Sequence, residues 1–152
     1  MTSRLPMLPV AAAGALLTVL ASGPAGAAGP ECAAGPVGVW SATVTVDGMS
    51  PHSSEIAFGE DGTACLSTPA STGRGTWTAS GGDRFTYRVK EVFTGDGASG
   101  WLVTDQKAVR SGAVFTSSGQ SKIYDAQGRE VATKQAVIKA TRKSATAPDC
   151  HA

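Results

Sequence analysis

Three side chains in the second half of the chain are of types that could transfer a proton. Tyr87 and Glu91 lie in the segment 85–93, where Phe, Tyr, Val, Glu and Phe occupy alternate positions and Thr86, Arg88 and Lys90 lie between them. In a β-strand this alternation places Tyr87 and Glu91 on the face that carries the aromatic side chains. A carboxyl group shielded from water can act as a general acid or base, and a phenol can donate a proton or orient a carbonyl. Tyr124, expected to face inward on a later strand, is the third candidate for a catalytic role.

A structural interpretation accompanies each of these assignments. Glu91 lies just before the glycine-rich turn at 94–100, so its carboxylate could lie at a wet end of the fold and pair with a basic residue, for which Lys107 is a candidate. Burial of aromatic side chains stabilises a core by area alone. The inward apolar residues are therefore expected either to pack as a core or to contact a ligand; they are Phe58, Trp77, Phe85, Val89 and Phe115.

Several classes of chemistry find no support in the sequence. It contains no Gly-x-Ser-x-Gly elbow, phosphate-binding loop, HExxH segment or dinucleotide fingerprint, which argues against hydrolase and nucleotide chemistry. The three cysteines lack metal-ligand spacing, so neither a metal nor a redox cofactor is implied. His52, beside Pro51, could lie on a lid over a binding site, although a histidine in such a loop is more often simply solvated.

The first 27 residues follow the pattern of a secretory signal peptide. A weakly basic start with Arg4 precedes an apolar run at 10–20, which is shorter than the roughly 20 residues of a membrane span. Small residues follow, and cleavage after Ala27 fits best. A retained membrane anchor is the alternative. After cleavage we expect a secreted protein without a stable membrane anchor.

Removal of this segment takes away one basic residue and leaves 12 basic against 12 acidic ones. A chain of near-zero net charge, with no run of Lys or Arg, lacks the basic face that nucleic-acid binding requires. We therefore expect no nucleic-acid partner. The sequence leaves the oligomeric state open.

Export makes one disulfide bond the expected use of the cysteines. Cys32 and Cys150 lie near the two ends of the mature chain, and the termini of a barrel often lie close together. A bond between Cys32 and Cys150 is therefore predicted, with Cys32–Cys65 as the alternative.

The rest of the chain predicts an all-β domain. Alternating segments separated by glycine-rich turns predict strands at 40–46, 54–58, 64–67, 75–80, 85–93, 101–110, 113–124 and 129–142. Residues 68–74 are expected to form a flexible connection, and Gly119 predicts a bulge or a sharp bend.

Eight antiparallel strands with short turns favour a closed up-and-down barrel over a sandwich, because closure removes exposed strand edges. A barrel of this size is either filled by side chains or holds one small ligand. The expected organisation is a signal peptide at 1–27, an N-terminal segment at 28–37, the barrel at 38–143 and a tail at 144–152.

Gly38-Val39-Trp40, together with Arg142 at the end of the last strand, resembles the calycin class of barrels, which includes the lipocalins. The resemblance implies a tryptophan packed on the barrel floor under an arginine from the final strand, although the helix that precedes the last strand in lipocalins has no counterpart here. The segments at 85–91, 108–128 and 138–142 are similar to small bacterial barrels of the allene oxide cyclase-like fold.

Some barrels of that class are cyclases that fold a polyketide or polyene chain inside an apolar lumen. The resemblance thus implies a hydrophobic small molecule as partner, held by a cofactor-independent cyclase or isomerase. The open alternatives are a carrier without turnover, similar to a lipocalin, and an exported interaction protein with a packed interior.

Overall fold

The computed structural model describes residues 35–94, 99–146 and 150. The chain divides into two units, 1–30 and 31–152, and all described residues belong to the second unit. The expected signal peptide and Cys32 lie outside the described residues. Within the described part of the chain, no helix is long and apolar enough to cross a membrane.

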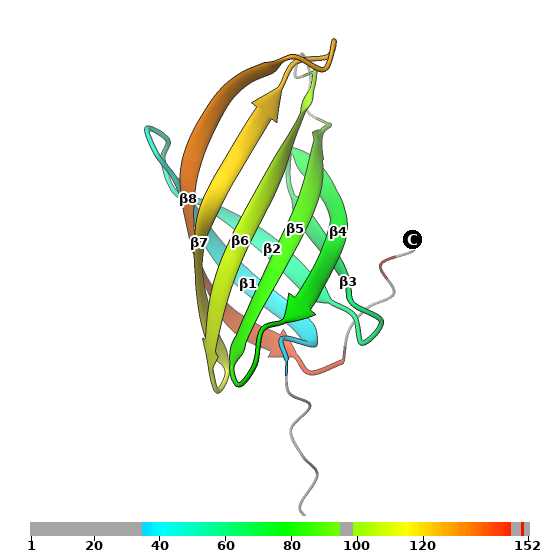
Figure 1. Ribbon diagram of the computed structural model, residues 1–152, viewed down its shortest axis with the longest axis vertical. Helices are drawn as coiled ribbons and strands as arrows, with labels where there is room; N and C mark the ends of the chain where they lie inside the picture. Colours follow the sequence, from blue (N-terminus) through cyan, green and yellow to red (C-terminus); the bar gives the residue numbers. More distant parts are fainter. Residues whose placement is uncertain (1–34, 95–98, 147–149, 151–152) are drawn as a thin grey trace, which may run out of the picture. The chain divides into compact units, whose positions relative to one another are not determined.

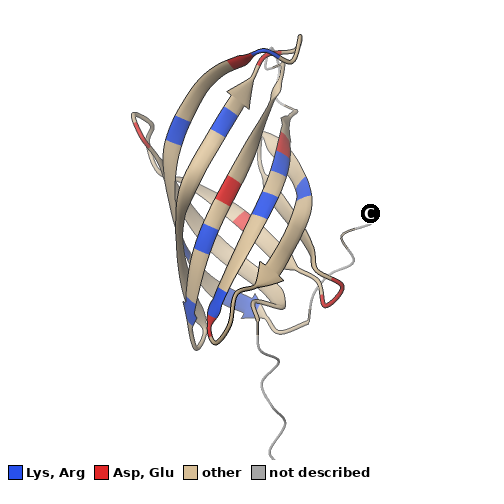
Figure 2. Ribbon diagram, in the orientation of Figure 1, with Lys and Arg blue, Asp and Glu red and all other residues tan. Residues whose placement is uncertain are grey.

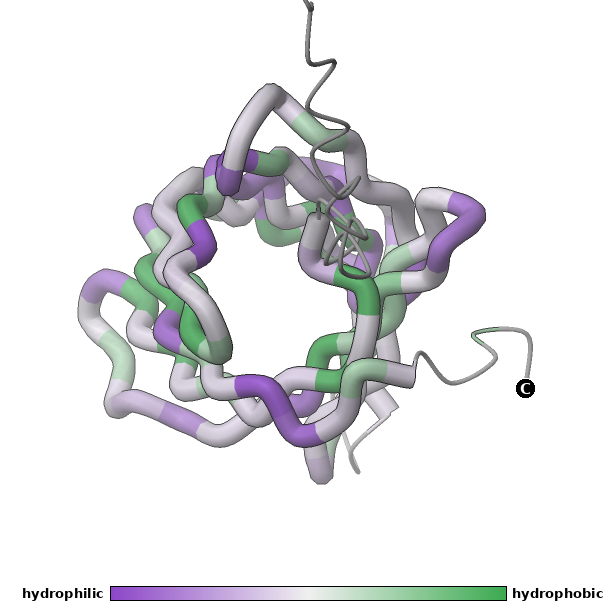
Figure 3. Tube along the Cα trace, turned by 90° about the horizontal axis from the view of Figure 1, so that it is seen from below, coloured by the Kyte–Doolittle hydropathy of each residue, from purple (hydrophilic) through white to green (hydrophobic). Residues whose placement is uncertain are grey.

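Eight β-strands make up the described unit (Figure 1). Their bounds are β1 Gly38–Val46, β2 His52–Phe58, β3 Thr63–Thr68, β4 Ser71–Ala79, β5 Arg84–Phe93, β6 Trp101–Ser111, β7 Val114–Tyr124 and β8 Glu130–Ser144. Each strand pairs antiparallel with the next, and β8 pairs with β1, so the sheet closes on itself. Figure 3 shows the ring that results when the strands are viewed from below. The predicted eight-stranded up-and-down barrel is confirmed.

The alternation of side chains fixes which residues face the interior. On β5, the side chains of Phe85, Tyr87 and Val89 are buried. Those of Arg84, Arg88 and Lys90 are exposed on the outer face. Successive side chains of a strand point to opposite faces, so a shift of one residue would turn the apolar side chains outward. The sequence pattern at 85–93 therefore determines the register of this strand.

The connection expected at 68–74 is wrong, because β4 begins at Ser71 and pairs with β3 through a tight turn at 69–70. Two glycines in this part of β4 let the backbones approach closely. A Cβ atom at Gly75 would lie only 1.8 Å from the carbonyl oxygen of Arg88. Most of the expected connection, including Gly73, thus belongs to a strand that is packed tightly on β5.

No bulge occurs at Gly119, which pairs with Gln106 and Ala136 in continuous register. This glycine is needed because a Cβ atom would lie 1.8 Å from the carbonyl oxygen of Asp105. Phe115 and Ser121 face inward, while Tyr124, which pairs with Trp101 and stacks on its ring, faces outward. The expected inward orientation of Tyr124 is therefore wrong.

Aromatic side chains fill one end of the barrel. The Phe58 ring lies at their centre, with ring centroids at 6.4, 5.4, 5.3 and 6.0 Å from those of Trp77, Phe85, Tyr87 and Phe115. All four pairs have edge-to-face geometry, an arrangement that aromatic quadrupoles favour. We call this half of the barrel the aromatic end.

Trp40 closes the aromatic end. Its side chain is fully buried, its Nε1 donates a hydrogen bond to the Pro36 carbonyl at 2.6 Å, and the Arg142 guanidinium lies 4.5 Å from the ring centroid. Arg142 also donates a hydrogen bond to the Val37 carbonyl at 2.9 Å. The contact between tryptophan and arginine that the calycin resemblance implies is therefore present.

The disulfide bond joins Cys65 to Cys150, so the predicted Cys32–Cys150 pairing is wrong. Cys65 lies half-buried on the middle of β3, three strands from β8 around the ring, or about 14 Å at ordinary strand spacing. The six residues from Ser144 to Cys150 can span about 20 Å. The tail after β8 can therefore reach β3, and such a bond fits an oxidising compartment.

Replacing both Cys65 and Cys150 by serine should lower the free energy of unfolding by about 2–4 kcal/mol, because the bond closes a long loop that the unfolded chain would otherwise explore. Denaturant unfolding under non-oxidising conditions measures the change. The matched control is Cys32→Ser, which should leave the disulfide and the stability unchanged. Loss of the bond in Cys32→Ser would contradict the assigned pairing.

Candidate functional site

The half of the barrel opposite the aromatic end contains a cavity of about 630 Å³. Its volume lies in the range typical of small-molecule sites, roughly 300–1,000 Å³. The cavity is lined by the ends of strands and by the turns at 49–50 and 69–70. Apolar side chains supply much of its surface; they are Val44, Val46, Met49, Leu66, Pro69, Ala70, Phe93, Leu102, Ile123, Ala136 and Ile138.

Glu91 lies in the wall of this cavity and is held there by two hydroxyl groups. The Ser71 Oγ donates a short hydrogen bond to Glu91 Oε1 and is itself 2.6 Å from the Thr68 Oγ1. Since the single Ser71 proton goes to the carboxylate, the Thr68 hydroxyl must donate to Ser71. The second carboxylate oxygen accepts no hydrogen bond from the described residues, so it is available to a ligand.

A second polar group in the cavity comes from β6 and β7. The Thr104 hydroxyl oxygen accepts hydrogen bonds from Gln106 Nε2 at 3.2 Å and from Ser121 Oγ at 2.9 Å. Thr104 and Ser121 line the cavity, and both are nearly fully buried. Both of these contacts use the Thr104 oxygen as acceptor. The Thr104 hydroxyl proton donates to none of the described residues, so it is available to a ligand.

The hydrogen bonds continue from the cavity toward the aromatic end. Gln106 Oε1 accepts a hydrogen bond from Ser117 Oγ at 2.9 Å, and Ser117 accepts one from the Tyr87 hydroxyl at 2.8 Å. These buried polar groups satisfy one another, which is the condition for keeping them inside a barrel. They form a layer between the aromatic rings and the cavity.

The structure separates the residues that the sequence grouped as a site. Glu91 and His52 line the cavity. The five residues expected to contact a ligand instead pack at or beside the aromatic end, outside the described lining; they are Phe58, Trp77, Phe85, Val89 and Phe115. Lys107, the suggested partner of Glu91, lies exposed on the outer face of β6.

Tyr87 faces inward but does not line the cavity. Only 3% of its surface is exposed, and burial raises the pKa of its phenol well above the ordinary value, a shift that the hydrogen bond to Ser117 partly opposes. A phenol with a raised pKa is a weaker acid. Tyr87 therefore stays protonated in the folded barrel and serves the packed polar layer.

The raised pKa of Tyr87 predicts a loss of stability at alkaline pH. The unfolded chain releases the phenol proton near pH 10, below the folded pKa, so folding stability is fully present below about pH 10 and falls above it. Ultraviolet absorbance of tyrosinate and circular dichroism should show the Tyr87 phenolate forming only as the barrel unfolds. In the control Tyr87→Phe this coupled absorbance step should vanish. Ionisation of Tyr87 with the fold intact would contradict the prediction.

Tyr124 lies on the outer surface, stacked on Trp101 with ring centroids 5.5 Å apart. The Lys90 ammonium lies over the Trp101 ring, 4.5 Å from the ring centroid. Neither ring lines the cavity. The position of Tyr124 gives it no contact with a ligand held there.

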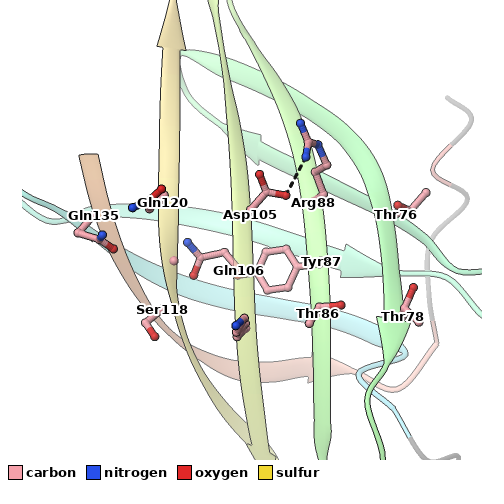
Figure 4. A pocket seen from close by; sticks show the side chains of 12 residues that line it. Thr76, Thr78, Thr86, Tyr87, Arg88, Asp105, Gln106, Ser118, Gln120 and Gln135 are labelled. Atoms are coloured by element: carbon pink, nitrogen blue, oxygen red, sulfur yellow. Dashed lines mark hydrogen bonds and ion pairs between the residues drawn. The ribbon is translucent and has the colours of Figure 1, made fainter. Parts of the chain in front are cut away.

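A shallow groove on the outer face of β4 to β8 is a second concave surface (Figure 4). Its lining is mostly polar, with several Thr, Ser and Gln side chains, and its Arg88–Asp105 ion pair, at 3.2 Å, is largely exposed. Figure 2 shows basic and acidic positions intermixed over the strands. The outer groove thus lacks the largely apolar lining that the interior cavity has.

Sequence reasoning missed three polar residues of the cavity: Ser71, Thr104 and Ser121. Ser71 was assigned to a connection that is in fact the start of β4. Thr104 and Ser121 occupy inward parity on strands that were predicted, so alternation from Phe115 or from Ala108 would have found them. Their small size and polarity gave no other signal.

The described residues contain no group of three or more His, Cys, Asp or Glu side chains that could hold a metal ion. In comparisons with protein-family models, with curated proteins and with solved structures, nothing matches the chain significantly.

Proposed function

We propose that this chain is an exported, calycin-like barrel that binds one hydrophobic small molecule in its interior cavity. The observation that carries the proposal is the cavity of about 630 Å³, lined largely by apolar side chains and reaching two of the turns. Apolar walls with a small number of placed polar groups are the usual composition of a small-molecule site. Glu91 and Thr104 supply those groups.

Binding without turnover is the form of this function that the geometry supports best. Of the three candidates for proton transfer, only Glu91 contacts the cavity, while Tyr87 is held in the polar layer and Tyr124 lies outside. A single carboxylate can orient a ligand without any reaction. The barrel is therefore proposed as a carrier similar in role to a lipocalin.

Titration with the neutral apolar dye N-phenylnaphthylamine tests the proposal. The dye should bind saturably at one site per chain, with the rise in fluorescence that follows transfer to an apolar cavity, and long-chain alcohols should displace it. Absence of saturable binding, or displacement only by polar compounds, would contradict the proposed function.

A cofactor-free cyclase or isomerase acting on a polyketide-type chain is the second candidate, favoured by the fixed orientation of Glu91. Glu91 would serve as the acid or base, and the apolar walls would fold the substrate chain for ring closure. Incubation of linear polyene or polyketide chains with the protein, followed by mass and retention analysis, distinguishes the two functions. Conversion that is lost in Glu91→Gln would favour the enzyme over the carrier.

A further inference from the structure

The charge of the cavity wall carries information about the ligand. Among the described residues that line the cavity there is one acidic side chain, Glu91, and no lysine or arginine. His52 also lines the cavity, but it makes no ion pair with Glu91 in the described structure. The cavity therefore presents a carboxylate without a cationic partner of its own.

The neighbouring basic residue in the sequence does not compensate this charge. Lys90 points to the outer face of β5, where its ammonium lies 4.5 Å from the Trp101 ring centroid. Lys107 is exposed on the outer face of β6. A carboxylate in a largely apolar wall without a cationic partner is unfavourable, and a bound cation would relieve that cost.

The carboxylate is also held in one orientation before any ligand binds. Ser71 is 3% exposed and donates a hydrogen bond to Glu91 Oε1. The Thr68 hydroxyl donates to Ser71 Oγ. The Thr68 oxygen in turn accepts a hydrogen bond from the Ala70 amide at 3.1 Å. Oε2 is left as an acceptor in a cavity wall that also includes the apolar side chains of Leu66 and Phe93. A pre-oriented acceptor of this kind favours a charged donor over a neutral one.

We infer that the ligand is an apolar molecule with a protonated amine, whose ammonium group binds Glu91 while its hydrocarbon part fills the cavity. The inference rests on the proposed binding function and adds to it the class of ligand. It also predicts discrimination: an apolar carboxylic acid of the same length brings a second negative charge to Glu91 and is rejected. Amines are thus selected over fatty acids.

Calorimetric titration with decylamine, decanol and decanoate near neutral pH tests the inference, since the three probes share one chain and differ in charge. Decylamine should bind about 10-fold tighter than decanol, and decanoate weaker than both, because a charged hydrogen bond adds about this factor. Glu91→Gln should remove the preference for the amine, so that decylamine and decanol bind this variant within about twofold of each other.

The matched control is Glu60→Gln, which removes the same charge from an exposed turn at the aromatic end. It should leave all three affinities unchanged. Ser71→Ala keeps the charge but releases Glu91 Oε1, so it should weaken decylamine binding by a smaller factor, about threefold. Circular dichroism confirms that each variant is folded.

The possible outcomes distinguish failure of the amine preference from failure of the binding function itself. If decanol binds but decylamine has no advantage, or if Glu91→Gln weakens all three probes alike, the amine preference is overturned and the cavity remains a binding site. If decanoate binds tightest, the inference is likewise overturned. If no probe binds at all, the proposed function itself fails.

Discussion

Replacing Ala136 by phenylalanine is expected to weaken binding of N-phenylnaphthylamine and of decanol by about 100-fold or more. Ala136 is 2% exposed and lines the cavity from β8, opposite Gly119 on β7. A benzyl side chain at this position projects into space that the ligand would occupy. Fluorescence titration of the dye measures the loss.

The control lies one residue away on the same strand. Val137 is 47% exposed on the outer face, so Val137→Phe adds a ring of the same kind outside the barrel. It should leave both affinities within about twofold. Equal binding by Ala136→Phe and the native chain, with circular dichroism showing an intact barrel, would mean that the ligand does not enter the cavity.

Replacing Phe58 by alanine should lower the free energy of unfolding by about 3–5 kcal/mol, the range for removal of a buried aromatic ring. Phe58 is fully buried and its ring lies within 6.4 Å of four other aromatic rings. Removing it leaves an empty volume in the middle of the aromatic end, where the rigid neighbours cannot close in fully. Denaturant unfolding with the disulfide intact gives the change.

The exposed Val92 on β5 offers a control, because Val92→Ala should change the unfolding free energy by no more than about 0.5 kcal/mol. The folded fraction of Phe58→Ala should still bind decanol, since Phe58 lies outside the described lining of the cavity. A loss below about 1 kcal/mol would show that the aromatic cluster does not stabilise the barrel as described.

The strand content and the closed barrel could be predicted because alternation on strands such as β5 is unbroken, and short turns leave few other topologies. Glu91 could be placed in a cavity wall for the same reason: it continues the inward row that begins at Phe85. Which residues share one face of a strand depends only on their spacing along the chain, so it can be predicted from the sequence.

The misassigned positions depend on contacts between segments far apart in the chain. The segment at 68–74, with Gly73, looks like a connection until the backbone of β5 is seen against it, and Gly119 looks like a bulge until Asp105 is placed beside it. The disulfide partner of Cys150 depends on how the tail crosses the barrel. The division of the interior into an aromatic end and a cavity follows from side-chain volumes that meet only after closure.

A crystal structure of the protein with a bromine-terminated decanol, in which anomalous scattering locates the bromine, shows directly whether a ligand enters the interior cavity. We expect a single bromine peak inside the barrel, between Leu66 and Ile138 and on the cavity side of Thr104. A peak confined to the outer groove near Arg88, or aromatic side chains rearranged to fill the cavity, would contradict it.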